Sequence, residues 1–258
     1  MSDAGLLALQ VRTTNKAFWR NPASAFFTFA FPLMFLVIFT SLLGSGTAEV
    51  APGVEIQQDS YYVAAMAAFA VISATYTNLA ISIAFTRDAG ILKRTRGAPL
   101  PAGIYLGARV THAILISILL VVITTAFGVA FYQADIPSGA LLWEHLATVV
   151  VGAMAFSALG LATTAIVPNA DAAPAVVNAI ILPLLFLSGI FIPLGPDAPQ
   201  WMKVVGDIFP VKHFAEAMLG SFYGPPLPFE WSDVAVVAAW GVVGLALAIR
   251  FFSWEPRR

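Results

Sequence analysis

The sequence contains no cysteine, and this absence removes several kinds of site at once. Without thiols the chain can form no disulfide, no thiolate metal site and no cysteine nucleophile. Its three histidines, His112, His145 and His213, lie far apart in the sequence. We therefore expect no metal site in this chain.

Charge is also scarce, because only 10% of the 258 residues are Asp, Glu, Lys or Arg and the formal net charge is -1. A nucleic-acid-binding protein carries a basic stripe, so this composition argues against a nucleic-acid partner. Hydrophobic residues make up 59% of the chain, and the mean hydropathy is +0.85. Soluble domains contain roughly 45–50% apolar residues, so the composition indicates a membrane protein surrounded by lipid.

Motifs for nucleotide binding and hydrolysis are missing as well. None of the four lysines follows a glycine, which excludes a G-x-x-x-x-G-K-[ST] loop, and neither H-E-x-x-H nor G-x-S-x-G occurs. The apolar runs contain no acidic residue that would mark a proton or ion relay. We predict that the chain is not an enzyme, binds no cofactor, and depends on another chain for any ATP chemistry.

Long uncharged apolar runs are what the sequence does contain. Each is long enough, or nearly so, for the roughly 20 residues that cross a bilayer as a helix. They predict a single all-α transmembrane domain over residues 1–258, with six spans and both termini on one side. The predicted spans are 23–44, 61–85, 104–131, 146–167, 172–192 and 234–249.

Lysine and arginine are distributed unevenly between the segments that connect these spans. With cytoplasmic termini, eleven of the thirteen cations lie on the cytoplasmic side and only Lys203 and Lys212 lie outside. Positive residues favour the cytoplasmic face, so we predict that both termini are cytoplasmic. The eleven are Arg12, Lys16, Arg20, Arg87, Lys93, Arg94, Arg96, Arg109, Arg250, Arg257 and Arg258.

Amphipathic segments flank the first and fifth spans. Residues 4–20 place Leu7, Val11 and Phe18 on one helical stripe, which predicts an interfacial helix, although a polar tail with incidental apolar residues is the alternative. Residues 199–222 form two stripes separated by Pro210, which predicts two short outer helices that either re-enter the membrane or lie flat on it. Their aromatic residues include Trp201, Phe209 and Phe214. Residues 44–60, with Gly44 and Pro52, are expected to form an ordinary external loop.

A basic segment, residues 86–97, lies between the second and third spans. Thr86 is a candidate N-cap and Asp88 falls in the first turn of the predicted helix, while Lys93, Arg94 and Arg96 fall in its last turn. Gly97 and Pro99 are expected to end it. The charges either orient the protein in the membrane or, together with exposed Ile91 and Leu92, dock a soluble partner; Arg87 belongs to the same cation cluster.

Uncharged polar residues lie at membrane depth. Thr75, Asn78 and Ser82 share one face of the second span, and Asn178 lies in the fifth. Such residues either line a substrate path or form hydrogen bonds between helices, which is their commoner use.

The order of these features resembles the permease subunits of type-2 ATP-binding-cassette transporters. Two segments of the sequence are similar to motifs of that family. The coupling-helix motif matches Arg87, Asp88, Gly90, Leu92, Lys93, Arg94, Arg96 and Pro99, and the end of span five with the outer helices matches Ser188, Gly189, Pro193, Pro199, Trp201 and Pro210. The family often has Glu where Thr86 and Asp88 stand, and Asn-Pro in place of Phe209-Pro210.

The resemblance implies a dimer of this subunit in a bacterial cytoplasmic membrane, bound to two copies of a separate ATPase that holds ATP and Mg. Movement of the coupling helix 86–97 would link that ATPase to the spans. The uncharged spans and small outer loops suggest export of an amphipathic drug-like molecule or lipid. The alternatives are a lipid-linked polysaccharide exporter of the same family, a stand-alone channel or secondary carrier, and a membrane anchor without a transport role.

Overall fold

The computed structural model describes most of the chain. The described residues are 2–43, 46–51, 53–97, 100–134, 136–195, 198–224, 227 and 229–255. For Ala51 and Arg96 only the backbone is described. Several residues that the sequence analysis singled out lie outside this set. They are Gly44, Pro52, Pro99, Arg257 and Arg258.

Within the described residues, five helical segments are long and apolar enough to cross a membrane. They are α2 (Pro22–Leu43), the continuous run α3–η1–α4 (Gln58–Asp88), α6 (Ala102–Tyr132), α7 (Ala140–Thr163) and α11 (Trp231–Phe251). Each coincides with a predicted span. The predicted span 172–192 corresponds to α8, which covers only Ala173–Leu187 and is about 22 Å long at 1.5 Å per residue. The structure therefore supports five of the six predicted spans by length.

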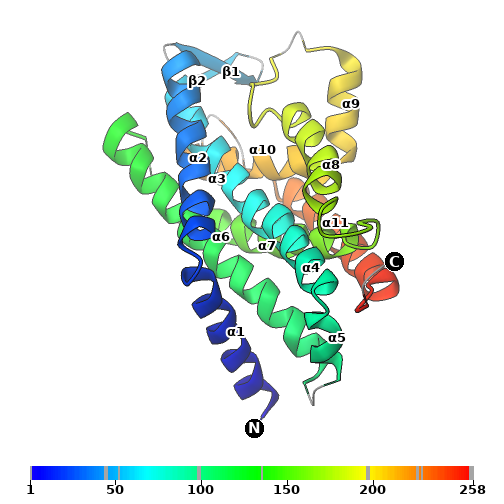
Figure 1. Cartoon of the computed structure of the whole chain (residues 1–258). Coiled ribbons are helices and arrows are strands. Elements are labelled where there is room, and N and C mark those ends of the chain that lie inside the picture. Colours follow the sequence, from blue (N-terminus) through cyan, green and yellow to red (C-terminus); the bar gives the residue numbers. More distant parts are fainter. Residues whose placement is uncertain are drawn as a thin grey trace.

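The shorter elements lie toward the two ends of this bundle, except α10 (Pro210–Tyr223), which packs inside it against α3, α7 and α11 (Figure 1). They are α1 (Asp3–Trp19), β1 (Thr47–Ala51), β2 (Val54–Gln57), α5 (Ile91–Arg96), α9 (Gln200–Ile208) and α10 (Pro210–Tyr223). The strands pair antiparallel, with Thr47 opposite Gln57, so the prediction of an ordinary loop over 44–60 is wrong. Glu49 and Glu55 alternate with Ala48 and Ile56, and this period of two is the pattern of a half-buried hairpin.

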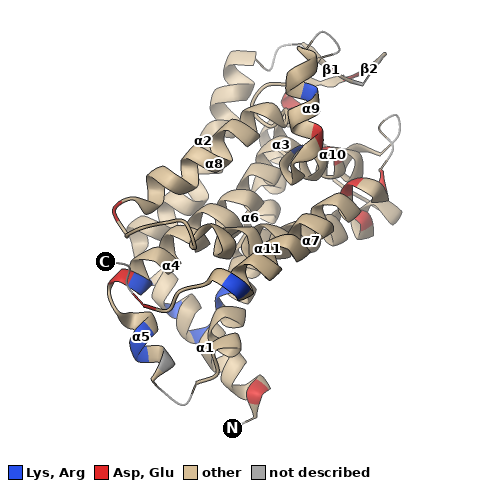
Figure 2. Ribbon diagram, turned by 90° about the vertical axis from the view of Figure 1, so that its right-hand side faces the viewer, with Lys and Arg blue, Asp and Glu red and all other residues tan. Residues whose placement is uncertain are grey.

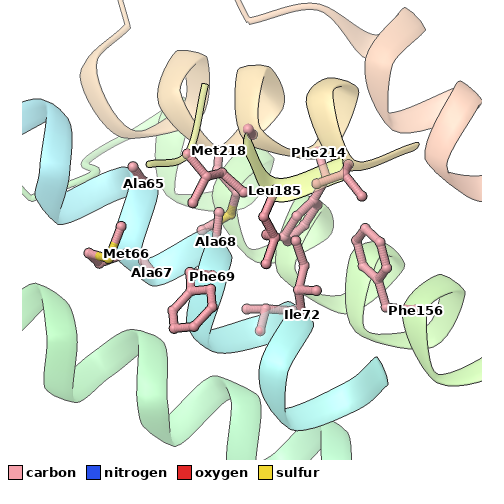
Figure 3. Close-up of a cluster of buried hydrophobic side chains, with 14 of the residues drawn as sticks. Ala65, Met66, Ala67, Ala68, Phe69, Ile72, Phe156, Leu185, Phe214 and Met218 are labelled. Carbon is pink, nitrogen blue, oxygen red and sulfur yellow. The ribbon is translucent and has the colours of Figure 1, made fainter. Parts of the chain in front are cut away.

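The helix α3 forms the centre of the core because neighbouring helices surround it. It packs against α2, α6, α7 and α10, and every residue from Tyr61 to Ile72 is buried. Its alanines leave room for larger side chains from the neighbours. Figure 3 shows Phe214 and Met218 of α10, Phe156 of α7 and Leu185 of α8 directed toward this alanine-rich helix.

Helix α1 packs lengthwise on α6. The predicted stripe of Leu7, Val11 and Phe18 is partly buried, and a side chain added at Gly107 of α6 would lie 3.7 Å from Leu7. Lys and Arg of α1, α4, α5 and the end of α11 gather in the same half of the molecule (Figure 2). We call this the basic end, and the half that carries β1, β2 and α9 the opposite end.

A π-helical turn, η1 (Ser73–Thr77), interrupts the long run between α3 and α4. It packs against α7 at Gly160, where an added Cβ would lie 2.8 Å from the carbonyl oxygen of Tyr76 and 3.2 Å from its Cα. The close approach of the two backbones therefore requires glycine at this position.

We expect the substitution Gly160→Ala to lower the midpoint of thermal unfolding of the detergent-solubilised protein. The new methyl group meets backbone atoms that cannot rotate away, so a loss of about 1–3 kcal/mol is expected although alanine favours a helix. The control is Gly103→Ala in the first turn of α6, where an added Cβ has nothing within 4 Å. Equal unfolding midpoints for the two variants would contradict the close packing of η1 on α7.

Candidate functional site

Two charged side chains tie the end of α4 to the connection between α7 and α8. The side chain of Arg87 is 1% exposed, and its guanidinium donates hydrogen bonds to the carbonyl oxygens of Thr164 at 2.9 Å and Val167 at 2.7 Å. The carboxylate of Asp88 accepts a hydrogen bond from the backbone N–H of Ala170. Because the planar guanidinium can satisfy several acceptors at once, Arg87 compensates the carbonyl groups left open where α7 ends.

The predicted helix over 86–97 is wrong in its first half. Thr86 is not an N-cap, because it lies inside α4 and its hydroxyl donates to the carbonyl oxygen of Ser82 at 3.0 Å. Asp88 is the last residue of α4 rather than part of a first turn. Gly90 then adopts a left-handed conformation with φ of 69°, which cannot continue a helix, and α5 begins at Ile91.

Helix α5 is therefore short and has one buried face. Leu92 is fully buried in a cluster with Leu79, Ile83, Leu161 and Ala248, so the expectation that it is exposed is wrong. Its burial fixes the orientation of α5 against α4, α7 and α11. On the other side, Ile91 is 43% exposed, and Lys93 and Arg94 are exposed as predicted. Buried Arg87 and Leu92 thus anchor the segment, and Ile91, Lys93 and Arg94 form its available surface.

A cavity of about 510 Å³, lined by both polar and apolar residues, opens between α1, α2, α4 and α6 at the basic end; we call it the polar cavity after its hydrogen-bonding side chains. Asn78 and Ser82, two of the four candidate path residues, line it. The other two predicted path residues lie elsewhere among the described residues. Thr75 is buried and donates to the carbonyl oxygen of Val71 at 2.6 Å, while Asn178 is half-buried on α8. Thr75 thus bonds within its own helical run, which is neither a lining role nor the hydrogen bond between helices that was the alternative prediction.

Arg109 and His112 are the strongest polar groups of this cavity, and the sequence analysis did not assign them to a path. Arg109 donates a hydrogen bond to the hydroxyl of Ser82 at 2.7 Å. Its Nε and the Nε2 of His112 are buried and lack a hydrogen-bond partner within the described part of the chain. The spacing i, i+3 on a helix was the available signal, since it places both side chains on one face of α6.

An apolar groove of about 500 Å³ adjoins the polar cavity. The two are joined through aromatic rings: Phe18 of the cavity lies 5.2 Å from Trp19 of the groove, and Trp19 stacks on Phe29 at 5.6 Å. The groove is lined by Trp19, Pro22, Ala25, Phe26, Phe29, Ala30 and Leu33. Polar hydrogen-bonding groups and a hydrophobic surface therefore lie next to one another at the junction of α1 and α2.

The three aromatic residues predicted for the outer helices have different surroundings. Trp201 is 62% exposed, whereas Phe209 stacks on Trp240 of α11 with ring centroids 5.6 Å apart. Phe214 is buried and meets Phe156 edge to face. Phe209 and Phe214 thus hold the outer helices against α11 and α7, and Trp201 is left on the surface.

A group of charged residues joins α9, α10 and α11 at the opposite end. Lys212 contacts Asp207 at 2.5 Å and Glu216 at 3.6 Å, and His213 contacts Asp233 at 2.7 Å. Burial of the His213 ring opposes protonation, but its hydrogen bonds with Asp233 and the carbonyl oxygen of Asp207 outweigh burial and raise the pKa of His213 above its ordinary value.

Replacing Arg87 with alanine is expected to destabilise the protein by about 2–4 kcal/mol, because it leaves buried carbonyl groups without their charged donor. Thermal unfolding followed by tryptophan fluorescence should show the loss. The matched variant Lys93→Ala removes an exposed cation from the same segment and should leave the unfolding midpoint nearly unchanged. If the two variants unfold at the same temperature, Arg87 does not anchor the end of α4.

Comparison with known proteins agrees with the family resemblance of the sequence over most of the chain. Residues 6–223 match the family model described as "ABC-2 type transporter". The chain is 25% identical over 228 residues to the protein named "Inner membrane transport permease YadH" of Escherichia coli K12, covering 86% of this chain and 82% of the relative. The YadH proteins of Escherichia coli O157:H7 and Shigella flexneri match to the same extent. The chain therefore belongs to the ABC-2 type transporter family and is a transmembrane transport permease.

Proposed function

We propose that this chain is the non-catalytic membrane subunit of an exporter that moves an amphipathic molecule, driven by a separate ATPase. The observation that carries the proposal is the junction of the polar cavity with the apolar groove. A drug-like amphiphile or a lipid could place its polar part near Asn78, Ser82 and Arg109 and its apolar part along Trp19 and Phe29. Ligand sites commonly combine an apolar lining with a few placed polar groups in this way.

The proposed orientation places the basic end in the cytoplasm of a bacterium, with both termini on that side. The cations of α1, α5 and α11 gather at this end (Figure 2), and the positive-inside preference supports the assignment. The cavity would then open toward the cytoplasm or the inner leaflet, which suits uptake of a substrate for export. Family membership implies an ATP-binding partner, which would hold ATP and Mg, and a second copy of this subunit would complete the assembly.

The surface of α5 is the proposed contact with the ATPase. Ile91 supplies an apolar contact, while Lys93 and Arg94 supply positive charge that complements an acidic partner surface. The buried anchors behind this surface connect it to the rest of the bundle: Leu92 belongs to a buried cluster with residues of α4, α7 and α11, and Arg87 of α4 donates to carbonyl oxygens of the α7–α8 connection. A displacement of α5 by the ATPase would therefore reach three spans through packed side chains.

The docking surface is tested by the double substitution Lys93→Ala and Arg94→Ala in the complex reconstituted with its ATPase. Because both side chains are exposed, folding should be preserved, while copurification of the ATPase and amphiphile-stimulated ATP hydrolysis should fall about tenfold. Arg250→Ala, which removes an exposed cation at the end of α11, is the matched control. Unchanged copurification and unchanged ATP hydrolysis in the double variant would refute docking through α5.

The substrate cavity is tested by Asn78→Leu, which replaces a polar lining group with an apolar one. We expect the concentration of amphiphile that half-maximally stimulates ATP hydrolysis to rise about tenfold, which corresponds to about 1.4 kcal/mol of binding. Asn178→Leu makes the same change on α8, outside the cavity, and should leave that concentration unaltered. Vesicle assays that show ATP-driven movement of hydrophilic ions alone would refute an amphipathic substrate.

A further inference from the structure

Three side chains at the opposite end of the molecule bring potential metal ligands together. His213 and Glu216 lie at i, i+3 on α10, and Asp233 lies in the first turn of α11, which packs against α10. One ligand atom from each residue lies within 4.8 Å of the other two. The proposed substrate cavity and the α5 surface do not involve these residues, so the cluster has no role in the function proposed above.

The hydrogen bonds of His213 restrict what lies between its ring and Asp233. Its Nε2 is 2.9 Å from the carbonyl oxygen of Asp207, which can only accept, so Nε2 carries a hydrogen. In a neutral ring the lone pair of Nδ1 would then face the Asp233 carboxylate oxygen at 2.7 Å, which is repulsive. At this distance a proton must lie between the two atoms, and a metal ion would take its place only if they moved apart.

The partner of Nε2 is one that a metal-binding histidine also requires. Histidine ligands usually donate their second ring N–H to a backbone carbonyl or a carboxylate, which fixes the ring and directs the other nitrogen at the metal. His213 has this arrangement, with the carbonyl of Asp207 behind it and two carboxylates in front. We propose that His213, Glu216 and Asp233 bind one divalent metal ion, with Zn²⁺ the best match to a nitrogen and two oxygen ligands.

The geometry requires only side-chain adjustment. Zn²⁺ lies about 2.1 Å from nitrogen and oxygen ligands, so tetrahedral ligands are about 3.4 Å apart. The His213–Asp233 contact of 2.7 Å would therefore open by about 0.7 Å to admit the ion, and Glu216 would move inward. Glu216 is 46% exposed on its side chain, which leaves it room to move and gives the ion a path from solvent.

Surrounding charge also suits a cation. The charged groups around the His213 ring are the carboxylates of Asp207, Glu216 and Asp233 and the ammonium group of Lys212. Three carboxylates against one ammonium leave an excess of negative charge. Lys212 lies 2.5 Å from Asp207 and 3.6 Å from Glu216, so Asp207 retains the ammonium group when Glu216 turns to the metal.

A metal at this position would join the outer elements into one unit. It would link α10 directly to α11, and the hydrogen bond from His213 to Asp207 would extend the link to the end of α9. The sequence analysis expected no metal site because the histidines lie far apart. A search for histidine clusters does not find this group, because it combines one histidine with two carboxylates from two helices.

The test is titration of Zn²⁺ into the full chain, purified in detergent and stripped with EDTA, by isothermal titration calorimetry. We expect one Zn²⁺ per chain, a rise of several degrees in the unfolding midpoint, and no comparable response to Mg²⁺. His213→Gln and Asp233→Asn should each weaken Zn²⁺ binding at least tenfold. Glu230→Gln removes a neighbouring carboxylate outside the cluster and should bind as the parent protein does.

Replacement of Zn²⁺ by Co²⁺ provides a second readout, because Co²⁺ bound by His213 should show visible absorption that the His213→Gln variant lacks. Absence of stoichiometric Zn²⁺ binding, or equal binding by His213→Gln and the parent, would overturn the proposal and leave a protonated His213 paired with Asp233. These measurements need neither the ATPase nor a transported molecule, so their failure would leave the proposed export function untouched.

Discussion

The buried guanidinium of Arg87 determines how the basic end of the bundle is held together. Backbone carbonyl groups left open after α7 have no helical partners, and in an apolar environment each needs a donor. Arg87 supplies donors to two of them from α4, which also carries the cavity residues Asn78 and Ser82. Arg87 therefore fixes the end of α4, which carries part of the cavity wall and leads into α5, together with the apolar cluster of Leu79 and Ile83.

Within a few residues, this segment carries both buried side chains that anchor it and exposed side chains that are available to a partner. Arg87 and Leu92 face the protein, while Ile91, Lys93 and Arg94 face outward. Left-handed Gly90 makes this possible because it reorients the chain between α4 and α5. In a continuous helix Ile91 and Arg94 would follow Arg87 by four and seven residues and would therefore lie on its buried face.

Hydropathy predicted the spans well because crossing a bilayer requires a long apolar segment whatever its neighbours are. The prediction was less accurate where boundaries depend on local backbone or tertiary contacts. Hydropathy extended the fifth span to residue 192, yet α8 ends at Leu187, and the hairpin of β1 and β2 was missed because its alternation is short. The family resemblance singled out the segment around Arg87 and Lys93, but it could not separate buried from exposed side chains.

The candidate site residues also divide into those that the sequence predicted and those that depend on tertiary contacts. Asn78 and Ser82 were predicted from helical spacing on one segment, and both line the cavity. Arg109 and His112 were not, because their role depends on α1 and α2 closing over α6. The cluster of His213, Glu216 and Asp233 depends on packing between two helices, and spacing along the chain carries no information about it.

The π-helical turn η1 sets the rotational phase between the two halves of the second span. A single π-turn amounts to one extra residue in an α-helix, and one residue corresponds to a rotation of about 100° for everything that follows. The half before η1 is matched to α2, α6 and α10, and the half after it directs Asn78 into the cavity and Arg87 toward the α7–α8 connection. In a regular helix without the extra residue, only one half could keep its contacts. If the half before η1 stayed packed against α2, α6 and α10, the half after η1 would be rotated away from the cavity and the α7–α8 connection.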